Sequence, residues 1–191
     1  MGVVDRLCQS IVFGLCLGVP AVGAAAQDMP PLPKPGPEHQ LFKEDEGTWD
    51  AKVEVFPGPG AAPMVSKGVE INTVGCGGLC LITDFKGEVM PGQVFHGHGT
   101  AAYDPQKKKY VGTGVDSNSM SIGHYEGSVD AAGKTLTMEG EMPSPFEPGK
   151  SVRVREVIEI KSPDQKTITT SVQGPDGSWF PLVTVNARRK K

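Results

Sequence analysis

The stretch Gly47-Thr48-Trp49-Asp50-Ala51-Lys52-Val53-Glu54-Val55 decides the fold of this chain. From Trp49 onward, apolar side chains occupy every second position and alternate with charged ones. Successive side chains of a strand point to opposite faces, so the alternation predicts a half-buried antiparallel strand. A tryptophan at the start of a first strand is placed to seal one end of a small β-barrel.

From Thr48 onward, nine short segments with turn chemistry divide the chain. They span residues 57–60, 77–78, 91–92, 104–105, 117–119, 130–133, 143–149, 163–164 and 175–177. Nine turns separate ten strands, and no interval between them has a sustained helical period. The 25 glycines and 17 prolines fit such a turn-rich chain. We therefore expect an all-β domain, an antiparallel up-and-down barrel of about ten strands, because closure removes exposed strand edges.

The first 26 residues have the three regions of a signal peptide. Arg6 lies near the start, residues 11–22 are mostly apolar, and Ala24-Ala25-Ala26 forms a small-residue cleavage site. Glycines and Pro20 interrupt the apolar run, which is shorter than the roughly 20 residues of a bilayer span. We expect cleavage before Gln27, a periplasmic or secreted mature protein, and no stable membrane span in it.

The segment that follows divides into a linker and the start of the barrel domain. Residues 27–36 are rich in proline and predict an extended linker. Pro37 then suits the first turn of a short helix, Leu41 and Phe42 give it an apolar face, and Gly47 can end it. Such a helix could cap a barrel end, and residues 37–191 are expected to form a single domain.

The charge of the chain argues against nucleic-acid binding. The formal net charge is −3, and the basic residues are scattered rather than arranged in a stripe. Phosphate backbones are bound by clustered basic residues, which this chain lacks outside its short basic C-terminal tail.

Several weak motifs occur in one order along the chain. They are Gly47-Thr48-Trp49, the Pro-rich 57–64, Gly77-Gly78, Gly97-x-Gly99 before Tyr103-Asp104, Lys109-Tyr110, Val115-Asp116-Ser117, 136–140 and Val154-Arg155-Glu156-Val157. In this order the chain resembles, over roughly residues 35–190, the bacterial domain-of-unknown-function family fifteen-seventy-nine. That family is regarded as calycin-like, similar in architecture to lipocalins and nitrobindins. The resemblance implies a barrel but no agreed activity, since fold does not imply function.

One position differs from the pattern of the relatives. They commonly carry a tryptophan in the strand before the Asp-Ser pair, where this chain has Gly114. If Gly114 points inward, the missing indole leaves a larger cavity. The alternative is a bulge or a close approach of another backbone.

Cys76 and Cys80 flank Gly77-Gly78-Leu79 at a predicted hairpin turn. An extended strand would hold them about 13 Å apart, too far to bond. A three-residue loop would instead place them opposite each other, and an oxidising compartment then favours a disulfide. The alternative, a zinc half-site, lacks a second cysteine pair.

The histidines give a weak metal signal. His96 and His98 share one face of a strand, His124 lies on another strand, and Asp116 ends the strand between them. Such a set suits zinc or copper, although an alternating polar pair more often marks a solvent-facing surface. In nitrobindin-like relatives a late histidine holds haem, and no histidine follows His124, so haem is disfavoured.

Glu156 lies in an apolar row, because alternation along residues 152–160 puts it on the face of valines and isoleucines. A buried carboxylate must find a partner or keep its proton, and either outcome can mark a ligand-binding or proton-transfer site. The alternatives are a structural hydrogen bond to Tyr103 or Tyr110, or a bulge that turns Glu156 outward. Trp49 is interpreted first as a core residue, on which Arg188 or Arg189 could stack as in lipocalins.

These observations predict an exported barrel that binds a small, largely apolar molecule in its interior. The expected lining is Trp49, Phe85, Tyr103, Gly114 and Glu156. The alternatives are an envelope protein that binds zinc or copper through the three histidines, and an enzyme that uses Glu156. No cofactor is predicted, and an enzyme is disfavoured because no Gly-x-Ser-x-Gly elbow presents a nucleophile.

Overall fold

A computed structural model gives the structure of residues 31–58, 60–90, 92–119, 121–144, 147 and 149–191. The expected signal peptide and the start of the expected linker lie outside these residues. No helix in the described part of the chain is both long and apolar enough to cross a membrane.

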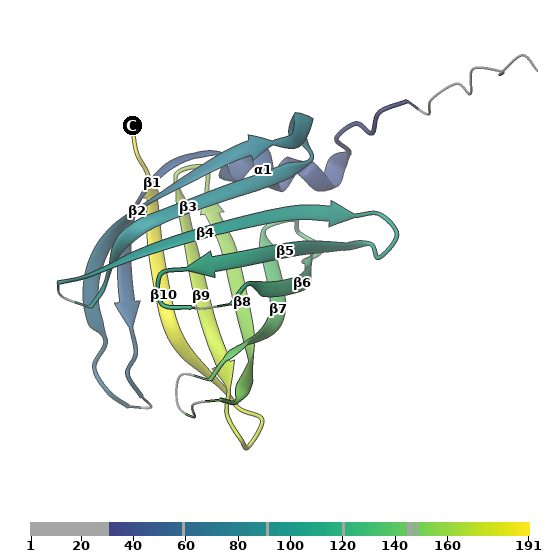
Figure 1. The fold of residues 1–191 in the computed structure, drawn as a ribbon. Helices are drawn as coiled ribbons and strands as arrows, with labels where there is room; N and C mark the ends of the chain where they lie inside the picture. Colours follow the sequence, from purple (N-terminus) through teal and green to yellow (C-terminus); the bar gives the residue numbers. More distant parts are fainter. Residues whose placement is uncertain (1–30, 59, 91, 120, 145–146, 148) are drawn as a thin grey trace, which may run out of the picture. The chain divides into compact units, whose positions relative to one another are not determined.

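Ten antiparallel strands of the described chain close into one barrel. They are β1 (Gly47–Val55), β2 (Met64–Gly75), β3 (Cys80–Met90), β4 (Gln93–Asp104), β5 (Lys109–Asp116), β6 (Gly123–Val129), β7 (Thr135–Pro143), β8 (Ser151–Ser162), β9 (Gln165–Gln173) and β10 (Trp179–Arg189). Each strand pairs with its neighbours in sequence, and β10 pairs with β1. In Figure 1, β2 to β5 cross the direction of β7 to β10 at a large angle. The fold prediction is confirmed, although Asp104 and Pro143, predicted in turns, are the last residues of β4 and β7.

The alternation along β1 sets which side of the barrel wall is inside. Trp49, Ala51 and Val53 are buried, whereas Asp50 and Lys52 are exposed. The pairing with β10 runs without interruption from Trp49 opposite Arg189 to Val55 opposite Val183. Because successive side chains point to opposite faces, the inward residues of β1 identify the inward residues of β10, and the registers of the other pairs extend this assignment around the barrel.

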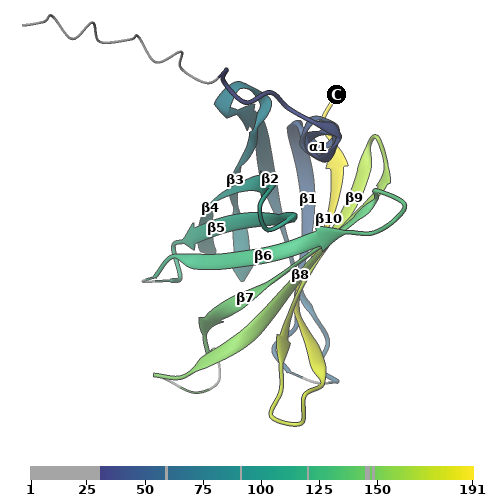
Figure 2. The same cartoon turned by 90° about the vertical axis from the view of Figure 1, so that its right-hand side faces the viewer.

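A short helical segment covers one end of the barrel. It consists of a 3-10 turn, η1 (Pro37–His39), and α1 (Gln40–Asp45). Figure 2 shows α1 at the end where β1 begins and β10 ends. A six-residue helix is not stable alone, so α1 depends on packing. Leu41 and Phe42 supply that packing, because both are buried in the barrel end.

One cluster of the core lies under α1, and it consists of six buried residues: Leu41, Phe42, Leu81, Tyr110, Leu136 and Met138. Further buried residues continue the core along the strands, among them Trp49, Val53, Val154 and Val172. The ring of Phe42 meets the ring of Tyr110 edge to face at 5.8 Å between centroids. The hydroxyl of Tyr110 donates a hydrogen bond to the carbonyl of Glu38, 2.8 Å away, and so fixes η1 over the barrel. The expected capping helix is therefore present.

Candidate functional site

The barrel interior brings together four of the residues expected to line a site. The strand registers place Phe85, Tyr103, Gly114 and Glu156 on the inward face of β3, β4, β5 and β8. All four are partly exposed although they point inward. Tyr103 packs against the core cluster under α1, and its ring meets the ring of Tyr110 at 5.3 Å between centroids. Trp49 also points inward and is fully buried, so it belongs to the core.

Gly114 lies in a row of glycines across three strands. It pairs with Gly99 of β4 on one side and with Gly123 of β6 on the other. The pairing with β4 passes through Gly114 and the pairing with β6 ends there, and neither has a register shift, so the bulge alternative is wrong. A Cβ atom at this position would meet only Tyr125 Cε2, 3.6 Å away, which is an ordinary contact. The missing side chain therefore leaves room on the inner wall.

Aromatic rings elsewhere in the interior pack along the wall at glycine positions. Cβ atoms on Gly68 and Gly87 would collide with the ring of Phe85, and a Cβ atom on Gly97 would press on the ring of Phe95. The two rings contact each other with centroids 6.0 Å apart. These glycines let the rings lie against the strands. The sequence analysis did not identify Phe95, although its alternation with His96 and His98 places it inward.

A buried ionic cluster joins α1 to the barrel wall. The Lys166 ammonium contacts Asp45 Oδ1 at 2.5 Å and also binds Glu70 Oε1. Asn72 Nδ2 donates to Asp45 Oδ2 at 2.9 Å and to Glu70 Oε1 at 2.6 Å. Lys166 also lies over the Trp49 ring, with its Nζ 4.6 Å from the centroid. The cluster ties α1, β2 and β9 together at the covered end.

Burial dominates the electrostatics of this cluster. Desolvation raises the pKa of Asp45 from 3.8 to about 6, Lys166 opposes that rise, and the nearby Glu70 charge adds to it. The sequence analysis missed Lys166, Glu70 and Asn72. The alternation that singled out Glu156 also places Lys166 in the inward row with Ile168 and Val172, so the signal was available.

Arg189 completes the covered end. Its guanidinium lies 4.1 Å from the centroid of the Trp49 ring, which confirms the expected stacking. Its Nη2 donates to the carbonyl of Glu44 at 2.6 Å, its Nη1 to the carbonyl of Glu46, and its Nε to the carbonyl of Pro163 at 2.8 Å. Because cations favour helix C-termini, Arg189 both caps α1 and covers Trp49.

Glu156 faces the interior and has a single hydrogen-bond partner among the described residues. The hydroxyl of Thr170, its cross-strand neighbour, donates to Oε2 over a long 3.5 Å. The pairing with β7 and β9 is continuous at Glu156, so the outward bulge is wrong. The alternative of a structural hydrogen bond is met by Thr170 rather than by a tyrosine: no bond joins Glu156 to Tyr103 or Tyr110 among the described residues, and the Tyr110 hydroxyl binds Glu38. Desolvation raises the pKa of Glu156, and the negative charge of Glu70 raises it further.

The three candidate metal ligands lie on the outer surface. His96, His98 and His124 are exposed, and His98 Nδ1 contacts Asp84 Oδ1 at 2.7 Å. Within the described residues, no three His, Cys, Asp or Glu side chains gather in an arrangement that could hold a metal ion. Zinc or copper binding by the histidines stays a prediction for a solution experiment.

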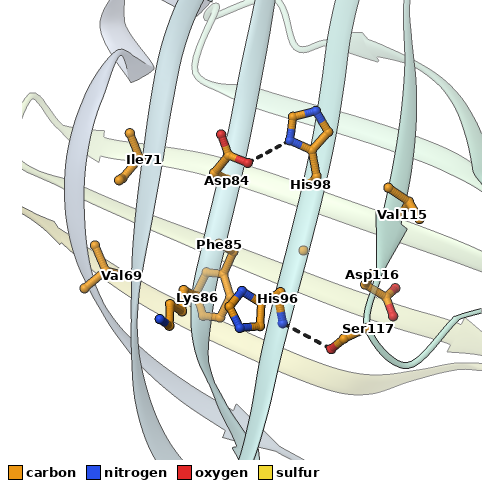
Figure 3. A pocket seen from close by; sticks show the side chains of 11 residues that line it. Val69, Ile71, Asp84, Phe85, Lys86, His96, His98, Val115, Asp116 and Ser117 are labelled. Atoms are coloured by element: carbon orange, nitrogen blue, oxygen red, sulfur yellow. Dashed lines mark hydrogen bonds and ion pairs between the residues drawn. The ribbon is translucent and has the colours of Figure 1, made fainter.

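His96 and His98 line an open hollow of about 580 Å³ on the outside of β2 to β5, shown in Figure 3. The backbone N–H of His96 donates to Ser117 Oγ at 3.1 Å, and aliphatic side chains complete the hollow, among them Ile71 and Val115. A second open hollow, of about 1320 Å³, lies on the outside around β1. Both hollows lie on the outer surface and are distinct from the barrel interior.

Cys76 and Cys80 meet at the turn between β2 and β3. Their sulfur atoms lie within bonding distance, and their Cα atoms are 5.6 Å apart, as a disulfide requires. Cys80 pairs with Gly75, so Cys76 sits in the turn itself, in the 3-10 segment η2 (Cys76–Gly78). Oxidation of the pair in the cell stays a prediction.

A closed antiparallel barrel with a short helix over one end defines a calycin-like fold. The family model described as "Protein of unknown function (DUF1579)" matches residues 34–189, and the chain belongs to that family. No curated protein sequence matches the chain.

Two solved structures show the same fold at low identity. The structure of the S-type phycobiliprotein lyase CPES from Guillardia theta is similar with a TM-score of 0.55 and 12% identity, over 80% of this chain and 92% of that one. The structure of Rv2717c from M. tuberculosis is similar with a TM-score of 0.58 and 10% identity, over 82% of this chain and 99% of that one. At these identities the likeness concerns the fold alone.

Proposed function

We propose that this protein binds a small, largely apolar molecule inside its barrel. The observation that carries the proposal is the partial exposure of side chains that point inward, such as Phe85, Phe95 and Tyr125. A filled barrel would bury such rings, as it buries Trp49 and Phe42 under α1. Val53, Val154 and Val172 are buried away from α1, so we place the ligand beside the partly exposed rings of β3, β4 and β6.

The lining has the composition of a ligand site. Small-molecule sites are mostly apolar and aromatic, with a few polar groups that orient the ligand. Here the aromatic rings and the glycine row supply the apolar wall, and Thr170 and Glu156 supply polar atoms. Burying roughly 200 Å² of apolar ligand surface at about 25 cal/mol per Å² stabilises a complex by some 5 kcal/mol before ordering costs. That supports weak but measurable affinity.

Binding of the uncharged apolar dye Nile red to the full chain tests the proposal. We expect one site, detected by dye fluorescence and by quenching of tryptophan emission. Gly114→Trp should abolish binding, because an indole at this position enters the open space without a contact closer than 3.6 Å at its Cβ atom. Val115→Trp is the matched control, since Val115 is 43% exposed on the outer surface. Equal dye affinity in wild type and a well-folded Gly114→Trp variant would refute interior binding.

We further propose that the protein acts after export, in the periplasm or outside the cell. The leader pattern at residues 1–26 supports this location. The intact mass of the protein isolated from its host should correspond to a chain that begins at Gln27. A mature protein that retains the leader would contradict it.

A further inference from the structure

The charges of the interior are unbalanced. Of the lysines and arginines in the described strands, only Lys166 and Arg189 point inward. Both lie at the end covered by α1 and are engaged there, Lys166 by two carboxylates and Arg189 by three carbonyls and Trp49. The strand registers turn the others to the outside. No cation of the described strands therefore faces the accessible part of the interior.

Carboxyl groups exceed cations on the inward side. Asp45, Glu70 and Glu156 interact electrostatically, and Lys166 is the ammonium group they share. Lys166 contacts Asp45 and Glu70 directly, whereas its interaction with Glu156 is electrostatic only. Glu156 is thus the carboxyl group of this set without a bonded counter-charge.

Two carboxyl or amide oxygens on the inward face, Glu156 Oε1 and Asn72 Oδ1, are hydrogen-bond acceptors without a donor in the described chain. Asn72 Oδ1 is the only buried side-chain polar atom of the described chain that lacks a partner, so Glu156 Oε1 is not fully buried. Asn72 is itself only 2% exposed, faces inward from β2, and connects to the same network through Glu70. An unsatisfied acceptor in an apolar surrounding is stabilised by a ligand that brings donors.

We propose that the ligand of the barrel is a hydrophobic amine, whose ammonium group donates to Glu156 while its apolar body lies along the glycine row beside Tyr125. An ammonium group carries three donors and a positive charge, which match the acceptor atoms and the charge excess of the interior. A fatty acid would place a second carboxylate beside Glu156 and is disfavoured. The inference rests on the proposed function, because it specifies the ligand class for the same interior.

Displacement of Nile red from the full chain by three twelve-carbon compounds tests the inference. Dodecylamine, dodecanol and dodecanoate share one apolar chain and differ in head-group charge. At about pH 7.5, we expect dodecylamine to displace the dye at a concentration at least about tenfold lower than dodecanoate, since a charge-assisted hydrogen bond accounts for such a factor. Dodecanol should fall between them.

Two variants locate the preference. Glu156→Gln keeps the size of the side chain and removes its charge, so it should remove the preference for the amine over the alcohol. Glu159→Gln is the matched control, because Glu159 lies on the same strand, pairs with Lys161 at 2.8 Å and is 40% exposed outside. It should keep the wild-type order.

The same displacement measured at several pH values tests the inference on the wild type, without a variant. Lowering the pH to about 4.5 protonates a carboxyl whose pKa is raised, so the preference for dodecylamine over dodecanol should decline. The titratable groups that act on Glu156 are Glu70 from β2, Lys166 from β9 and, facing it from β6, Tyr125.

The outcomes separate this inference from the proposed function. Absence of dye binding to the wild type would refute both. Dye binding that Gly114→Trp abolishes, combined with equal displacement by amine, alcohol and acid, would overturn the amine and leave interior binding intact. A preference for dodecanoate, an amine preference retained in Glu156→Gln, or an amine preference that does not change with pH would also overturn it.

Discussion

Asp45 should make the protein less stable at neutral pH than at mildly acidic pH. Its pKa is raised from 3.8 to about 6 in the folded protein, chiefly because burial disfavours the charged form. Between these two values the folded state holds a proton on Asp45 that the unfolded state releases. The free energy of unfolding therefore falls as the pH rises through this window, and the lost stability is regained as the pH falls toward 4.

The size of the effect follows from the two pKa values. One pKa unit corresponds to about 1.4 kcal/mol, so the ionisation of Asp45 lowers the free energy of unfolding by about 3 kcal/mol at pH 7. At pH 5 the same calculation gives about half of that amount. Asp45 is 7% exposed, so solvent screens this penalty little.

The assay compares wild type with Asp45→Asn in urea at several pH values between about 4 and 7, followed by tryptophan fluorescence. Asparagine has the shape of the protonated acid but does not titrate. The wild type should therefore gain stability relative to the variant by about 2–3 kcal/mol on acidification. Asp50→Asn is the matched control, because Asp50 is exposed on the neighbouring strand and its difference from wild type should change little with pH.

A stability difference between wild type and Asp45→Asn that is constant across this pH range would refute the argument. So would a difference that changes in the opposite direction, because it would mean that Lys166 and not burial dominates the pKa of Asp45.

Three further predictions concern other parts of the molecule. Arg189→Ala should lower the free energy of unfolding by about 2–4 kcal/mol, because it removes three hydrogen bonds and the stacking on Trp49, whereas Arg188→Ala should change it by less than about 1 kcal/mol, as urea denaturation will show. Cys76 and Cys80 should resist alkylation in unreduced, denatured protein, and incorporation of two labels by mass spectrometry would exclude the disulfide. If the exposed histidines bind zinc or copper, calorimetry will detect binding that acid reverses, and an absence of heat in the wild type would remove the metal hypothesis.

The architecture could be predicted because it depends on local signals. Proline, glycine and aspartate at the turns mark where the strands begin and end, and the alternation of side chains assigns each of them to one face of the barrel wall. The same alternation correctly placed Glu156 on the inward side. Whether a side chain points into or out of the barrel follows from its odd or even place along the strand, so it needs no knowledge of distant contacts.

Partners across the barrel could not be predicted in this way. A tyrosine was one alternative partner for Glu156, but its neighbours depend on which strands lie beside β8, and these give it Thr170. Lys166 and Asp45 are 121 positions apart in the sequence and meet only because closure brings β9 under α1. The alternation along β9 indicates that Lys166 points inward, whereas only the closed barrel shows which carboxyl groups it contacts.

The position of Lys166 decides what the rest of the interior can do. An isolated buried carboxylate is costly, and one ammonium group satisfies those it touches. Lys166 touches Asp45 and Glu70, so both carboxyl groups under α1 have a bonded counter-charge. Glu156 receives no such contact and keeps an oxygen without a donor within the described chain. A cationic ligand that binds inside the barrel, as proposed, would therefore find its partner at Glu156.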